Sequence, residues 1–102
     1  MKRIDLLGSE EILLWILDEE LSPNLALKIL NIKNAYIKCK EEVDLYTQSL
    51  KDTSLEENAK KVSEFLQQPI DFIHLIDWKD LSNEEGLKIS PNQLDKLSIF
   101  IK

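Results

Sequence analysis

Apolar residues recur at alternating steps of four and three along residues 25–50. The members are Leu25, Ile29, Ile32, Tyr36, Cys39, Val43, Tyr46 and Leu50. This spacing places all of them on one side of an α-helix, because about 3.6 residues complete one turn. Ser22 and Pro23 precede the series as a helix cap and a first helical residue. The pattern predicts a long helix over residues 23–50, roughly 42 Å in length.

Two shorter helices are predicted next to the long one. A serine, two glutamates and a nearly continuous apolar run predict a helix over residues 9–20. After a turn at residues 51–53, Ser54 and Glu57 form a capping-box pair that opens a predicted helix over residues 54–67. The expected arrangement is a long central helix in an antiparallel helical hairpin, with most of the apolar stripe in the protein's own core. Coiled-coil-like self-association is the alternative.

The period of the pattern changes after Pro69. Apolar and polar positions alternate in "PIDFIHLIDW", which is typical of a strand with one apolar face. "DLSNEEG" is predicted to be a loop and "LKI" a second short strand, which gives a short β element within residues 70–89. The opening "MKRIDLL" is predicted to be a brief strand or extended arm. Since a lone hairpin is marginally stable, the strands are expected to pair with this arm or to lie on the helices.

A second capping box, Ser90 with Gln93, opens a predicted C-terminal helix over residues 91–101. Together the elements describe a mainly α protein with a single domain over residues 1–102, because no linker, repeat or low-complexity run divides the chain. A chain of 102 residues with 43% hydrophobic residues builds a thin core, since it buries only about 60 to 65% of its unfolded surface. Help from a partner would be consistent with so thin a core.

The chain carries 19 acidic and 13 basic residues, which gives a formal net charge of -6. Such a surface repels a phosphate backbone, so no nucleic acid partner is expected. The lysines within residues 28–40 do not change this, because they scatter around the helix instead of forming a stripe. An acidic surface suits either a basic protein partner or simple solubility.

Cys39 is the single cysteine, which excludes an intrachain disulfide and a zinc site built on several thiolates. One free thiol fits a reducing cytoplasm. The apolar run "ILLWIL" is bracketed by acidic residues and is too short for a signal peptide or a membrane span. We therefore expect a cytoplasmic protein that does not bind a membrane.

The residues that catalysis needs are few. Cys39 and His74 are the single thiol and the single imidazole, so a nucleophile pair is formally available. Cys39 lies on the apolar stripe, where a cysteine is more often a small buried hydrophobe. His74 has Asp71 and Asp77 nearby, but this spacing favours a packed histidine over a metal ligand. We expect no catalytic residue, no cofactor and no metal, and hence a protein that is not an enzyme.

A second set of apolar residues lies on the long helix. Leu27, Leu30, Ile37 and Leu45 point roughly 110 to 150° away from the centre of the stripe. Two explanations stay open: the C-terminal segment packs on them, or they form an exposed contact patch. The candidate partner-binding residues are Trp15, Leu27, Leu30, Ile37 and Trp78, and each has core packing as its alternative.

Three stretches carry a resemblance to a known group of proteins. They are "ELSPNLALKILNIKNAYIKCKEEVDLYTQSL", "VSEFLQQPIDFIHLIDWKDL" and "GLKISPNQLDKLSIFI". In order and pattern they resemble small, uncharacterised helical proteins encoded by phages and prophages of low-GC Gram-positive bacteria. The resemblance covers most of residues 20–101 and rests on structural motifs. It offers no catalytic residue to transfer.

The resemblance implies a function in binding, within the cytoplasm of a host cell. The leading hypothesis is a phage-type inhibitor or anti-defence protein that docks an apolar helix face with an acidic rim onto a host or phage protein, and occludes or positions it. The alternative is a homo-oligomeric virion-assembly or chaperone subunit that closes a ring or dimer with the same surface.

Overall fold

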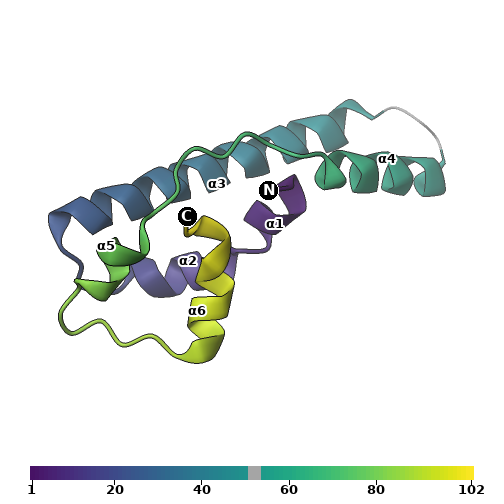
Figure 1. Ribbon diagram of the computed structural model, residues 1–102. Coiled ribbons are helices and arrows are strands. Elements are labelled where there is room, and N and C mark those ends of the chain that lie inside the picture. Colours follow the sequence, from purple (N-terminus) through teal and green to yellow (C-terminus); the bar gives the residue numbers. More distant parts are fainter. Residues whose placement is uncertain (51–53) are drawn as a thin grey trace.

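Residues 1–50 and 54–102 are described by the computed structural model, and most of them are helical (Figure 1). The elements are α1 (Arg3–Leu7), α2 (Glu10–Leu17), α3 (Pro23–Ser49), α4 (Leu55–Gln67), α5 (Trp78–Ser82), α6 (Pro91–Leu97) and the 3₁₀ helix η1 (Ser98–Phe100). The molecule is elongated, with extents of 54 × 23 × 22 Å. The mainly α class is confirmed, while the predicted turn at residues 51–53 lies outside the described part of the chain.

The predicted long helix is confirmed as α3, which ends one residue early because the backbone of Leu50 is extended. Half of the apolar stripe is buried, and the other members, Tyr36, Val43, Tyr46 and Leu50, are partly buried. The buried members are Leu25, Ile29, Ile32 and Cys39. Ser22 does not cap the helix with its side chain, because its backbone N–H and its hydroxyl both bond to the carboxylate of Glu84.

The core forms where α1, α2, α6 and the C-terminal residues pack around the buried stripe of α3. Its fully buried side chains are Phe100, Leu6, Ile16, Leu25, Ile29, Ile32, Ile76 and Leu97. α2 contacts both α3 and α6, and α1 contacts both α3 and α4. The C-terminal segment therefore packs on the same side of α3 as the short N-terminal helices (Figure 1).

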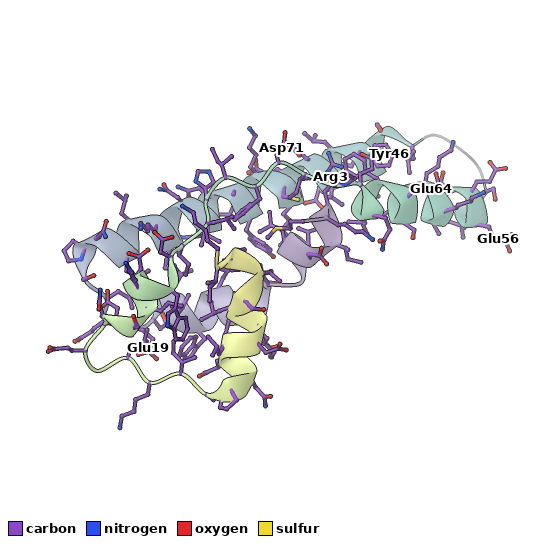
Figure 2. The ribbon with its side chains drawn as sticks, in the orientation of Figure 1. Arg3, Glu19, Tyr46, Glu56, Glu64 and Asp71 are labelled. Carbon is purple, nitrogen blue, oxygen red and sulfur yellow. The ribbon has the colours of Figure 1, made fainter. Side chains whose placement is uncertain are left out.

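α4 runs beside the C-terminal part of α3 in the opposite direction (Figure 1). Ser54 caps it, as predicted, by accepting a hydrogen bond from the Glu57 backbone N–H at 3.3 Å. The rings of Tyr46 and Phe65 stack with centroids 4.2 Å apart, and the Arg3 guanidinium lies 4.0 Å from the Phe65 centroid on α4. Figure 2 shows Arg3 and Tyr46 together at this junction of α1, α3 and α4. No residue of α4 is fully buried.

The prediction for the N-terminal residues was wrong. Residues 3–7 form the helix α1 and not a strand or an extended arm. The Lys2 backbone N–H donates to the Asp5 carboxylate at 3.0 Å, which closes the first turn, and Leu6 is buried in the core. The predicted helix over residues 9–20 is α2, which ends three residues early at Leu17.

The predicted short β element was also wrong, because residues 1–50 and 54–102 contain no strand. Residues 70–77 are extended, with only two isolated bridges near their ends: Lys2 with Pro69 and Ile76 with Ile101. Side chains alternate between partly buried and exposed over residues 70–74 and the alternation stops at Leu75, which is partly buried. Single-residue bridges do not build a ladder. The predicted loop "DLSNEEG" instead begins within α5, whose Leu81 is buried.

The predicted C-terminal helix is confirmed as α6, followed by η1. Its capping box is formed in both directions, as predicted. The Ser90 N–H donates to the Gln93 side chain at 2.9 Å, and the Gln93 N–H donates to the Ser90 hydroxyl oxygen at 3.2 Å. The element tightens into a 3₁₀ turn that places Phe100 in the core, so the α-helix ends before residue 101.

Candidate protein-binding site

The side of α3 that faces away from the core carries an apolar face, which we define as Leu27, Leu30 and Ile37. Their exposed fractions are 60%, 44% and 39%, although all three are large aliphatic residues. Their spacing of three and seven residues keeps them on one side of the helix, opposite the buried stripe. The C-terminal segment packs elsewhere, so of the two explanations left open by the sequence, the structure favours the exposed patch.

The apolar face continues onto α2. Leu14 and Leu17 line a hollow of about 90 Å³ together with Tyr36 and Ile37 of α3. Leu14 is exposed, because α2 turns Leu13 and Ile16 toward the core. The sequence did not single out Leu14, since every residue from Ile12 to Leu17 is apolar and such a run has no polar side to set its orientation.

The two tryptophans come from other elements than the apolar face. Trp15 lies on α2, is partly buried and packs against the core, so part of its surface is already covered by the protein itself. Trp78 is the first residue of α5 and is about half exposed. Of the five candidate residues, the structure therefore brings Leu27, Leu30 and Ile37 together on one helix, and leaves Trp15 and Trp78 outside this group.

A groove of about 580 Å³ lies beside the apolar face, between α3 and the extended residues 70–74. Its α3 wall carries Asn31, Asn34 and Lys38, which share the outward side of the helix with Leu27 and Leu30. On the opposite wall Ile73 is 81% exposed. The groove could not be predicted from the sequence, because its two walls come from separate parts of the chain, residues 31–42 and residues 70–74.

Cys39 and His74 both line this groove, so the structure does bring the single thiol and the single imidazole to one place. Burial raises the pKa of the Cys39 thiol, and the Glu42 carboxylate adds to the rise more than Arg3 offsets it. A thiol with a raised pKa is largely protonated at neutral pH and is a poor nucleophile. His74 packs against the edge of the Phe72 ring, with centroids 5.9 Å apart.

Charges of both signs surround the apolar face. Glu10 and Lys33 line the hollow shared with α2, and Glu42, Asp71 and Lys38 line the groove. Burial and the nearby Glu10 carboxylate raise the pKa of Tyr36, which keeps that phenol uncharged. The expected acidic rim is therefore accompanied by lysines, and the groove side carries more carboxylates than ammonium groups.

Within the described residues, no cluster of three or more His, Cys, Asp or Glu side chains is placed to hold a metal ion. No helix in that part of the chain is long and apolar enough to cross a membrane. Comparison with protein-family models, with curated proteins and with solved structures finds no match for this chain.

Proposed function

We propose that this chain is a non-enzymatic, phage-type protein-interaction module of the host cytoplasm, which binds a host or phage protein and occludes or positions it. The observation that carries the proposal is the apolar face of α3. Three large aliphatic side chains on one helix face remain open to solvent in a chain whose core is small. The adjoining groove extends this face over a second element.

The energetics of such a face favour binding to a protein. Fully burying a leucine or isoleucine contributes about 1.5 to 3 kcal/mol, so three half-exposed residues supply several kcal/mol when a partner covers them. A few buried anchors usually carry most of the affinity of an interface. The mixed charges around the face then set the on-rate and select the partner.

The proposal is tested with the double variant Leu27→Ser and Leu30→Ser. Because both side chains are already exposed, the variant is expected to fold, and helical circular dichroism checks this. Affinity capture from a lysate of a low-GC Gram-positive host is expected to enrich a specific protein with the unchanged chain and to lose it with the double variant. Titration calorimetry with that purified protein then measures the loss, expected to be at least about tenfold in Kd.

Leu55→Ser is the matched control, because Leu55 is 84% exposed but lies on α4, away from the apolar face. It is expected to leave the captured protein and its Kd unchanged. Equal weakening by the control and the double variant contradicts a role for the apolar face. The same follows if the double variant binds the captured protein as tightly as the unchanged chain.

The second candidate is a homo-oligomeric virion-assembly or chaperone subunit. It is favoured by the end of the molecule where α4 projects: α4 is amphipathic yet has no fully buried residue, and Leu45 and Leu55 are exposed there. Light scattering separates the two functions. An oligomer at micromolar concentration that resists added salt favours assembly, whereas a monomer favours a module that awaits its target.

A further inference from the structure

We propose that the extended segment Asp71–Leu75 accepts an added β-strand, so that an extended peptide of a partner protein pairs with its backbone and lies along the groove beside α3. This inference rests on the proposed function and deepens it, because it names the form in which the partner binds. It also predicts the character of the peptide, which is neutral or basic.

The first observation is a run of unpaired backbone groups. Within the described part of the chain, residues 71–75 neither donate nor accept a backbone hydrogen bond. The N–H and C=O groups of these five consecutive residues therefore have no backbone partner within the described chain. An extended segment of this kind is a template for another strand.

The second observation is that other parts of the chain already pair with both ends of this segment. The Ile70 N–H donates to the Met1 carbonyl at 2.8 Å, and the Arg3 N–H donates to the Gln68 carbonyl at 3.2 Å. At the other end, the Ile76 N–H donates to the Phe100 carbonyl at 2.8 Å, and the Lys102 N–H donates to the Ile76 carbonyl at 3.0 Å.

These bonds fix which edge of the segment is free. In an extended chain, alternate residues direct their backbone groups to the same edge. Gln68, Ile70 and Ile76 form their backbone bonds along one edge. From the alternation we infer that the odd-numbered residues between them, Asp71 and Ile73, present their N–H and C=O groups to the other edge. Because both ends are held in extended form, little conformational entropy is lost when a peptide pairs with the middle.

The third observation is the groove itself, whose volume of about 580 Å³ accommodates added chain. The side chains of Asn31 and Asn34 line it and form no hydrogen bond within the described residues. A carboxamide side chain both donates and accepts, as a peptide backbone does. A peptide in the groove therefore finds polar partners on α3 as well as on the extended segment, and its side chains reach the apolar face.

An extended peptide suits these groups better than a helix, because a helix already satisfies its own backbone. Charge then distinguishes a foreign peptide from a second copy. The groove carries Asp71 and Glu42 against Lys38, and each chain has a formal charge of -6. Figure 2 shows Asp71 on the extended segment beside α3. Pairing of two copies through this edge brings like charges together, whereas a neutral or basic peptide meets a complementary surface.

The test uses a displayed library of random linear peptides as the probe, selected against the full chain. The peptides enriched are expected to be neutral or basic. Ile73→Pro removes one N–H from the free edge, at a position that lies outside every helix. This variant is expected to raise the Kd of the selected peptide at least about tenfold.

Ile73→Ser is the matched control, because it removes the same exposed side chain but keeps the N–H. It is expected to change Kd by less than about threefold. A second measurement does not depend on any variant: the amide of Ile73 in the unchanged chain is expected to exchange more slowly when the peptide is bound. Both results together support strand addition.

Three outcomes overturn the inference. The first is that the library enriches no peptide. The second is that Ile73→Pro and Ile73→Ser weaken the binding of the selected peptide equally. The third is that the chain associates with itself and that Ile73→Pro abolishes this association. The proposed function is judged separately. A peptide or protein that needs Leu27 and Leu30 but tolerates Ile73→Pro supports the apolar face and rejects strand addition. The opposite pattern supports strand addition and rejects the apolar face as the anchor.

Discussion

Lys28 and Asp80 form the shortest ion pair described in the protein, with Nζ and Oδ2 2.6 Å apart. The pair joins α3 to the start of α5, and the Asp80 side chain is mostly buried there, with 15% exposed. The same carboxylate oxygen accepts the backbone N–H of Asp77 at 3.0 Å. These contacts explain why a segment that looks like a loop in the sequence forms a helix.

The pair makes stability depend on pH. The Lys28 hydrogen bond, followed by the Asp77 N–H, lowers the pKa of Asp80 below its ordinary value. The folded state therefore favours the ionised carboxylate, and this contribution is complete above the unfolded pKa of about 3.9 and is lost as pH falls through the lower folded pKa. Asp80→Asn keeps an acceptor for Asp77 but removes the charge.

We therefore expect Asp80→Asn to unfold at a lower urea concentration than the unchanged chain near pH 7. The difference between the two urea midpoints is expected to become smaller below about pH 4. Urea unfolding at several pH values measures this gap. Asp77→Asn is a suitable control, since the side chain of Asp77 approaches Lys102 only to 3.9 Å and is more exposed. A gap for Asp80→Asn that stays constant down to about pH 2 contradicts the role of the ion pair.

At the scale of single elements, α3 has two apolar sides with opposite roles. Ile32 is fully buried on the core side, whereas Leu30 belongs to the apolar face. Ile32→Ala is expected to lower the free energy of unfolding by about 2 to 4 kcal/mol, because it leaves a cavity. Leu30→Ala is expected to change it by less than about 1 kcal/mol.

Urea unfolding of the two variants measures the free energy of unfolding of each, so their losses of stability can be compared directly. Both changes end in alanine on the same helix, so helix propensity contributes little to the difference between them. Equal destabilisation by the two variants shows that Leu30 is covered in solution, which removes the apolar face as a binding surface. The expected order shows that only one side of α3 holds the fold together.

The elements that the sequence predicted correctly carry their own local signals. α3 has an unbroken apolar stripe, and α4 and α6 each begin at a serine cap that the structure contains. The apolar face of α3 was found by its angle on the helix. These features depend on residues three to seven apart, which the sequence displays directly.

The elements that the sequence did not predict correctly depend mostly on contacts between residues that are distant in the chain. α5 is stabilised by Lys28, which is far away in the chain. The residues that flank the extended segment, Ile70 and Ile76, bond to Met1 and Lys102, which are also distant in sequence. α1 is only five residues long, too short for periodicity to separate helix from strand. The groove and its exposed Ile73 could not be predicted for the same reason, since a surface built from two separate segments forms only when the chain is folded.

At the scale of the whole molecule, the two ends of the 54 Å body differ in how well they are packed. The end formed by α2, α6 and the first half of α3, labelled in Figure 1, contains most of the buried residues of the core. At the other end, α4 lies beside α3 with the short α1 against both, and Tyr46 of α3 stacks on Phe65 of α4. No residue of α4 is fully buried. The opening of α4 alone therefore exposes little buried surface.

This asymmetry determines where a protease cuts first. Trypsin is expected to cleave after Lys60 or Lys61 of α4 while the lysines of α6 and the first half of α3 stay intact, and mass spectrometry of brief digests identifies the order. Simultaneous cleavage throughout the chain contradicts it. A partner that binds only the well-packed end would leave the contact between α3 and α4 unchanged. In such a complex, α4 could still separate from α3 and return to it while the rest of the fold stays intact.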